Sequence, residues 1–245
     1  RVIDQAPLED YVRGVVGKEM SSLSARESLK AQAVMARTYA MSNLKKHGKD
    51  GFDLCDHDHC QVYGGVSGER PSVNAGVDGT RGIIMTAAGV PTSILYHATC
   101  GGSTADNDLV YGGKPLPYLR GVVCNYCRKG TNYRWVRRLP AEFLLRRLQV
   151  EKYLLKRIDS VQVFPLRGKD RADIVQVRSD RGTLRIKGTT FRRIANLPST
   201  TFWITDTKIA TKPVLADRKN PTAIPVVSVR SAPTRTPAGV ETGWR

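Results

Sequence analysis

The chain has 245 residues, of which 25% are charged and 40% hydrophobic, and its formal net charge at pH 7 is +17. This composition is that of a globular protein, and the length allows a sizeable core in one large domain or in two lobes. The sequence contains no apolar run of about eighteen residues, which excludes a transmembrane segment within it. The positive charge would attract any polyanion, but the basic residues are dispersed and follow no nucleic-acid-binding motif, so we expect no specific nucleic-acid partner.

The first part of the chain is predicted to be mainly helical. We expect a short strand at residues 2–3 and a helix at residues 8–16. A longer helix is predicted at residues 25–46, where Leu and Ala residues recur at helical spacing. Ser24 and Glu27, three positions apart, have the spacing of a capping box at its start. The small alanines of this helix would let another element pack closely against it.

The remaining chain combines short strands, two further helices and long loops. Residues 47–79 are rich in Gly, Asp, His and Cys and, like residues 99–134, are expected to form loops. This mixture of helices and short strands predicts an α+β fold. Strands are expected at residues 82–86, 91–98, 161–165, 174–178, 183–187 and 201–204, and helices at residues 140–157 and 190–196.

The end of the chain differs in composition from the rest. Residues 205–245 are rich in Pro and Thr and show no sustained periodicity, so we expect a flexible or divergent C-terminal tail there. Residues 1–204 are then expected to form one large domain, or two lobes around a groove. Because the first residue is Arg1 and not Met, we expect a mature or excised fragment, in which the lack of a signal peptide excludes nothing.

Histidines and cysteines gather in one stretch of the sequence. All four His and all five Cys lie between His47 and Cys127, and the densest patch is residues 55–60. Thiolates and imidazoles at such short spacings suit tetrahedral zinc, because one loop can bring several ligands to one ion. Cys124-x-x-Cys127 can also complete a site with Cys60 or Cys100, or form a disulfide in an oxidising compartment. The odd cysteine count excludes complete pairing within one chain.

Several motifs follow one another in a recognisable order. Glu19-Met20-Ser21 precedes ESLKAQAVMARTYA, and CQVYGG, TRGIIMTAAGVPTSILYHATCGGST and GTTFRRIANLPSTTFW follow. The series resembles the stage II sporulation protein D family (SpoIID/LytB domain) over residues 3–203. Two features depart from the family: Ser21 stands where its members have Pro, and the glycine- and histidine-rich GHGVG-type motif is not found.

The resemblance implies a lytic transglycosylase that cleaves the MurNAc–GlcNAc bond of peptidoglycan glycan strands and leaves 1,6-anhydro ends. It also implies an extracytoplasmic location and a role in cell-wall remodelling linked to sporulation. Such a reaction needs one carboxylic acid, whereas ordinary glycosidases use two carboxylates. Glu19 matches the family's catalytic glutamate. It would protonate the departing oxygen and then accept the proton of the sugar's C6 hydroxyl, and apolar neighbours would keep it protonated at rest.

Further site residues are expected from the helix that follows Glu19 and from the matched segments. The helix keeps polar side chains in a background suited to burial, and aromatic or glycine residues of the later motifs could border a sugar. Zinc in a structural role is implied by a family string that residues 55–60 match with one residue fewer. We expect substrate contacts from Lys30, Gln32, Arg37, Tyr63, Tyr96, Gly101, Gly102 and Ser103, and zinc ligation by His47, Cys55, His59 and Cys60.

Two other function classes remain open at this point. The first is a non-catalytic cell-wall-binding protein that stimulates a partner amidase, a role proposed for some relatives. The second is a nucleic-acid binder, which only the positive charge favours. The glycan product would separate a catalytic from a non-catalytic wall protein.

Overall fold

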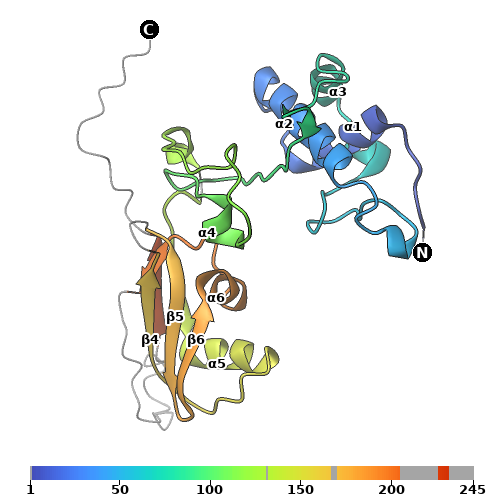
Figure 1. Cartoon of the computed structure of the whole chain (residues 1–245). Helices are drawn as coiled ribbons and strands as arrows, with labels where there is room; N and C mark the ends of the chain where they lie inside the picture. The colour runs from blue at the N-terminus through green and yellow to red at the C-terminus, as the bar shows by residue number, and fades with distance from the viewer. Residues whose placement is uncertain (1, 131, 167–169, 205–225, 232–245) are drawn as a thin grey trace, which may run out of the picture. The chain divides into compact units, whose positions relative to one another are not determined.

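The computed structural model describes residues 2–130, 132–166, 170–204 and 226–231. The chain divides into two units, Arg1–Tyr96 and His97–Arg245, and each is described by itself. The first unit is mainly helical and the second contains two antiparallel sheets with short helices (Figure 1). The predicted α+β class is therefore confirmed. Within the described residues, no helix is both long enough and apolar enough to cross a membrane.

Three helices build the first unit: α1 (Leu8–Glu19), α2 (Arg26–Ser42) and α3 (Pro71–Asp78). Glycines allow close approach at two points of this unit, and a Cβ on Gly76 of α3 would lie 3.0 Å from the Cβ of Leu29 in α2. A Cβ on Gly17 of α1 would lie 1.7 Å from the carbonyl oxygen of Gly68, so no larger residue fits there. The core of this unit consists of Val12, Val15, Val16, Leu29, Ala33, Ala36, Val73 and Val77.

The helix ends of this unit differ from the prediction. Helix α1 continues to Glu19, three residues beyond the expected end, and this extension places the carboxylate on the last turn. Helix α2 is shorter than predicted, and its N-cap is Ala25, with no side-chain cap hydrogen bond. The predicted capping box is wrong because Glu27 instead accepts a hydrogen bond from Lys30. Residues 2–3 form no strand and are exposed.

The segment between α2 and the end of the first unit is more ordered than a plain loop. It contains short 3-10 helices at Gly48–Asp50 and Gly65–Gly68 before α3. The two strands predicted for residues 82–86 and 91–98 reduce to the two-residue pair β1 (Thr86–Ala87) and β2 (Val90–Pro91). A two-residue turn joins them, and Ala88 and Gly89 both have positive φ, as a hairpin turn of type I′ requires.

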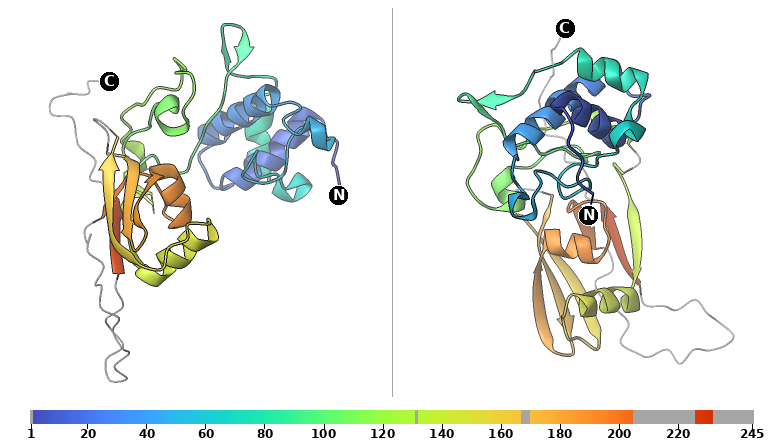
Figure 2. Two further views of the ribbon diagram at one scale, coloured as in Figure 1. Left: turned by 60° about the horizontal axis from the view of Figure 1, so that its bottom comes forward. Right: turned by 90° about the vertical axis from the view of Figure 1, so that its right-hand side faces the viewer.

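The larger sheet of the second unit has the order β4-β5-β6 and is antiparallel throughout. Its strands are β4 (Ile158–Pro165), β5 (Ala172–Ser179) and β6 (Gly182–Lys187), close to the three predicted strands. Helices α5 (Ala141–Val150) and α6 (Gly188–Ile194) lie on one face of this sheet in every view (Figures 1 and 2). The core between them includes Leu144, Leu148, Val161, Val175, Val177, Phe191 and Ile194.

The smaller sheet joins segments far apart in the sequence, in the order β3-β8-β7. Strands β3 (Val136–Pro140) and β7 (Phe202–Ile204) both pair with β8 (Val226–Ser231). The sequence prediction contained β7 but neither β3 nor β8, and it also missed helix α4 (Asn107–Tyr111). Strand β8 lies within the stretch expected to be a tail, and it buries Val229; the rest of residues 205–245 lies outside the described residues.

Candidate functional site

Glu19 is the last residue of α1, and its side chain is partly exposed. Its Oε1 accepts a hydrogen bond of 2.9 Å from the backbone N–H of Val62. The carboxylate also interacts with the hydroxyl of Tyr96. Both partners are neutral, and among the described residues Glu19 forms no ion pair. The carboxyl group thus lies at the C-terminal end of the helix, with neutral hydrogen-bond donors around it.

A buried glutamine connects Tyr96 to helix α1. Gln61 is fully buried, its Oε1 accepts a hydrogen bond of 3.2 Å from the Tyr11 hydroxyl, and its Nε2 donates one of 3.3 Å to the Tyr96 hydroxyl. Burial, together with the charge of Glu19, raises the pKa of Tyr96 to about 12, against the opposing effect of the Gln61 hydrogen bond. The Tyr96 oxygen therefore accepts from Gln61 and keeps its own proton for Glu19.

Tyr63, expected to stack on a sugar, is packed against α1. Its ring stacks on Tyr11, with centroids 5.1 Å apart and planes at 27°, and a Cβ on Gly14 would lie 2.5 Å from the ring. Its hydroxyl donates a hydrogen bond of 2.7 Å to Asp4. One ring face is thus occupied by protein, and the sugar contact of Tyr63 stays a prediction.

Arg37 is completely buried and fully engaged within the protein. Its Nε and Nη2 donate hydrogen bonds of 2.9 and 2.7 Å to the two carboxylate oxygens of Glu9. Its remaining bonds go to the carbonyl oxygens of Ile83, at 2.9 Å, and Val77, at 3.4 Å. A guanidinium held in this way has no exposed group to offer a sugar, so its geometry gives the expected substrate contact no support.

The geometry of the other two predicted substrate residues of α2 gives no support for a substrate contact either. Lys30 donates a hydrogen bond of 2.8 Å to the exposed Glu27 on the same helix. Gln32 is 5% exposed, and its Nε2 has no hydrogen-bond partner among the described residues. The cations of this helix therefore serve the helix and the core before any ligand.

The four predicted zinc ligands do come together in the loop that follows α2. The donor atoms of His47, Cys55, His59 and Cys60 all lie within 4.8 Å of one another. The Cys60 sulfur lies 3.4 Å from His47 Nε2 and 3.8 Å from His59 Nδ1, and the Cys55 sulfur lies 3.6 Å from His59 Nδ1. For zinc–sulfur bonds of about 2.3 Å, the corners of a tetrahedron are about 3.8 Å apart, so this donor set fits a zinc ion. His57 is a neighbour as well, at 3.2 Å from the Cys55 sulfur.

Surrounding groups hold the first of these ligands in place. His47 Nδ1 lies 3.6 Å from the carboxylate of Asp50, while Nε2 faces the Cys60 sulfur. The ring of Phe52 stacks on His47 with centroids 4.8 Å apart. A carboxylate behind a ligating histidine fixes the ring nitrogen that faces the metal.

The loop that brings His47, Cys55, His59 and Cys60 together leads directly to the partners of Glu19. Cys60 is followed by Gln61 and Val62, and these two residues contact Tyr96 and Glu19 respectively. The sequence did not predict Gln61, Val62 or Tyr11 as site residues. The available signal was the CQVYGG string, which contains the first two.

Gly101, Gly102 and Ser103 belong to the second unit, unlike the other predicted substrate residues. Gly101 and Gly102 have φ of 72° and 111°, which favours glycine. The carbonyl oxygen of Ser103 accepts a hydrogen bond of 3.3 Å from Arg171.

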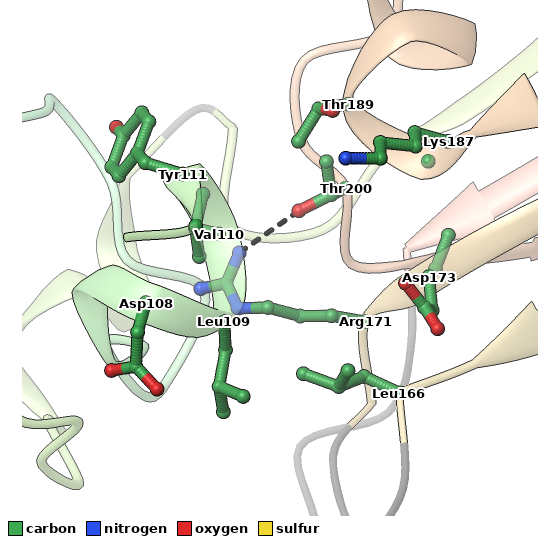
Figure 3. Close-up of a pocket in the computed structure, with 13 residues that line it drawn as sticks. Asp108, Leu109, Val110, Tyr111, Leu166, Arg171, Asp173, Lys187, Thr189 and Thr200 are labelled. Carbon is green, nitrogen blue, oxygen red and sulfur yellow. Dashed lines mark hydrogen bonds between the residues drawn. The ribbon is translucent and has the colours of Figure 1, made fainter. Parts of the chain in front are cut away.

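A cavity of about 220 Å³ lies in the second unit beside this arginine. Figure 3 shows the Arg171 side chain extending from the start of β5 toward α4, with a hydrogen bond of 3.1 Å to Thr200. Burial lowers the pKa of Arg171, and the described residues give it no carboxylate within ion-pair distance. The walls also include Asp108, Leu109, Tyr111, Asp173, Lys187 and Thr189.

Comparisons with known proteins agree with the motifs. Residues 1–86 match the SpoIID family, described as Stage II sporulation protein. The chain is 43% identical over 127 residues to an uncharacterized protein of Brachyspira hyodysenteriae, covering 51% of this chain and 34% of that protein. It is 30% identical over 164 residues to Stage II sporulation protein D of Bacillus subtilis, covering 61% and 48%.

A third relative has a different name. The chain is 35% identical over 108 residues to the Amidase enhancer of Bacillus subtilis, covering 44% of this chain and 14% of that protein. The match spans less than half the length of each of these three relatives. The resemblance to the SpoIID/LytB family seen in the motifs is confirmed: residues 1–86 match the SpoIID family, and the relatives carry the names Stage II sporulation protein D and Amidase enhancer.

Proposed function

We propose that this chain is a lytic transglycosylase that cleaves peptidoglycan glycan strands at the MurNAc–GlcNAc bond and leaves 1,6-anhydro ends. The observation that carries the proposal is the setting of Glu19, a partly exposed carboxyl group whose hydrogen-bond partners are all neutral. Among the described residues, no second carboxylate is hydrogen-bonded to Glu19, Gln61, Val62 or Tyr96. A single carboxyl group suits a reaction that uses the sugar's own hydroxyl in place of water.

The proposed reaction moves one proton out of Glu19 and one back. Protonated Glu19 donates to the glycosidic oxygen as the bond from that oxygen to C1 breaks. The C6 oxygen then forms a new bond to C1, and the carboxylate takes the proton that this hydroxyl loses. No water is consumed. Between the two transfers, the Val62 N–H and the Tyr96 hydroxyl stabilise the carboxylate by neutral hydrogen bonds.

Zinc is proposed as a structural partner of this site, held by His47, Cys55, His59 and Cys60. When bound, the ion would supply a rigid cross-link within the loop. Cys60 would then hold the adjacent Gln61 and Val62 against Tyr96 and Glu19. The proton transfers themselves need only the residues of the chain.

The proposed setting is the cell wall, outside the cytoplasm and linked to sporulation. Two relatives are named Stage II sporulation protein D and one is named Amidase enhancer. The net charge of +17 would attract the chain to anionic wall polymers by long-range electrostatics. This attraction would bring the protein to its substrate before any specific contact with a sugar forms.

A second function is favoured by the Amidase enhancer relative. In this alternative the chain binds the wall without cleaving it and stimulates a partner amidase. The Ser21 that follows the Glu19-Met20 pair departs from the family pattern and is compatible with such a loss of catalysis. The two functions differ in whether they need the acid of Glu19.

One experiment tests both functions. Purified wild type, Glu19→Gln and Glu27→Gln are incubated with intact peptidoglycan and with peptide-stripped glycan, and the products are analysed by mass spectrometry. We expect anhydro ends from wild type and from Glu27→Gln, and none from a folded Glu19→Gln. Glu27 is the matched control because it is an exposed glutamate at the start of α2. Undiminished anhydro products from Glu19→Gln would remove Glu19 from the mechanism.

Absence of products from all three proteins would favour the second function. That function is supported if wild type and Glu19→Gln then stimulate an amidase equally.

A further inference from the structure

A second group of metal-ligand side chains lies in the second unit, apart from the loop of His47 and Cys60. The sulfurs of Cys100, Cys124 and Cys127 all lie within 4.8 Å of one another. The sulfurs of Cys100 and Cys127 are 3.4 Å apart. These three residues have no role in the proposed transglycosylase reaction.

Backbone hydrogen bonds pin the segments that carry these cysteines. Ser103 and Val123 form an antiparallel bridge. The N–H of Thr104 donates to the carbonyl oxygen of Val122 at 2.9 Å, and the N–H of Cys124 donates to that of Gly102 at 2.9 Å. The convergence of the sulfurs therefore follows from paired backbone and does not depend on side-chain rotamers alone.

Backbone N–H groups also point at two of the sulfurs. The N–H of Gly102 donates to the Cys100 sulfur at 3.4 Å. The backbone amides of Tyr126 and Cys127 donate to the Cys124 sulfur. Such donors stabilise a thiolate, which is the form that binds a metal.

A positive charge lies beside the cluster. Arg171 interacts electrostatically with Cys100 and has no carboxylate at ion-pair distance among the described residues. Three thiolates with a divalent ion carry one net negative charge. The single positive charge of the Arg171 guanidinium would balance it.

We propose that Cys100, Cys124 and Cys127 form a second zinc site, distinct from that of His47, Cys55, His59 and Cys60. Three thiolates fill three corners of a tetrahedron and leave the fourth open to water or an external ligand. A disulfide would instead join two sulfurs at about 2.05 Å and leave the third cysteine unused. The mutual approach of all three sulfurs fits the metal better than the disulfide. This inference does not depend on the transglycosylase proposal.

The test counts bound zinc in the full chain. Wild type, Cys124→Ser and Cys60→Ser are reduced, loaded with zinc chloride, desalted and analysed for metal per chain. We expect two zinc ions in wild type and one in each variant, because each variant loses a different site. One zinc in wild type that is retained by Cys124→Ser and lost by Cys60→Ser would overturn the proposal.

A second measurement on wild type alone covers the case in which Cys124→Ser fails to fold. Alkylation with iodoacetamide, with and without zinc, is followed by peptide mass spectrometry. Zinc should slow alkylation of Cys100, Cys124 and Cys127 at least tenfold. Equal alkylation in both samples, or a native disulfide joining two of these cysteines, would overturn the second zinc site.

Discussion

Helix α1 carries a glutamate near each end, and the two have opposite surroundings. Glu9, in the first turn, forms a two-point ion pair with the buried Arg37. Although burial opposes the shift, the hydrogen bonds from Arg37 and from the N–H of Gly82 lower the pKa of Glu9. Glu19, in the last turn, accepts a hydrogen bond from the neutral Val62 N–H and interacts with the neutral Tyr96 hydroxyl.

Glu9 is thus paired with a buried cation, whereas Glu19 has neutral partners and is the proposed site of proton transfer. The N-terminal end of a helix stabilises a negative charge and the C-terminal end disfavours it, so the helix dipole reinforces the difference between the two. Glu9 is held as a permanent anion by a cation. Glu19 has only neutral partners, and we propose that it is the general acid and base.

The largest effect on the free energy of unfolding is expected from breaking the ion pair between Glu9, at the N-terminal end of α1, and Arg37. Glu9→Gln leaves the Arg37 guanidinium buried without a counter-charge, which should cost at least about 3 kcal/mol in the free energy of unfolding. Urea unfolding followed by circular dichroism measures this loss. Glu19→Gln is the matched variant and should change the unfolding free energy by less than about 1 kcal/mol. Equal losses in the two variants would remove the distinction between the two ends.

The proposed zinc site of His47, Cys55, His59 and Cys60 can be tested through Asp50, which lies behind His47. Asp50→Ala removes the carboxylate behind His47 and should weaken zinc binding at the first site by about 10- to 100-fold. Competition with a chromophoric chelator measures the affinity. Asp58→Ala is the control, since this exposed residue lies in the same loop. Unchanged affinity in Asp50→Ala would show that Asp50 does not orient His47.

A smaller effect, on stability and on product release, is expected when Glu19 at the C-terminal end of α1 loses the hydroxyl of Tyr96. Tyr96→Phe deletes the hydroxyl that accepts from Gln61 and interacts with Glu19, at a cost of about 0.5–1.5 kcal/mol. If that bond strengthens as the carboxylate forms, the rate of anhydro-product release falls by up to about tenfold. The measurement is product release at saturating glycan. A full rate with a lowered thermal midpoint would assign Tyr96 to stability alone.

Part of the loss of stability at acidic pH should come from Glu9, because its ion-pair partner Arg37 is buried. The pKa of Glu9 in the folded chain lies below its ordinary value of 4.5. Its ion pair therefore contributes stability that is fully present above that value and is lost as the pH falls through the folded-state pKa. Thermal midpoints measured from neutral to acidic pH should fall less steeply in Glu9→Gln than in wild type. Parallel curves would show that Glu9 does not govern acid unfolding.

Local patterns in the sequence predicted the parts of the fold that depend on near neighbours. Strands β5 and β6 follow from the alternation of apolar and polar residues, and Gly182 in the turn between them has φ of 95°. The convergence of His47, Cys55, His59 and Cys60 was predicted because the four residues lie within fourteen positions of one another. A loop of that length can bring all four side chains to one point without help from distant segments.

Features that depend on distant partners were missed. Strand β8 pairs with β3 across more than eighty residues, and proline-rich flanks concealed it. Arg37 was expected at a ligand because its partner Glu9, 28 positions away, was not foreseen. Gln61 gains its role only when α1 and Tyr96 meet it. In each case the residue type was visible in the sequence and its partner was not.

The most direct test of the proton-transfer role of Glu19 is product analysis in water enriched in heavy oxygen. Wild type is expected to release glycan fragments with anhydro ends that contain no heavy oxygen, because the C6 hydroxyl replaces water. Folded Glu19→Gln should release none, while Glu9→Gln, assayed where it is folded, should give the wild-type product. Heavy oxygen at the new ends, or undiminished release by Glu19→Gln, would contradict the account.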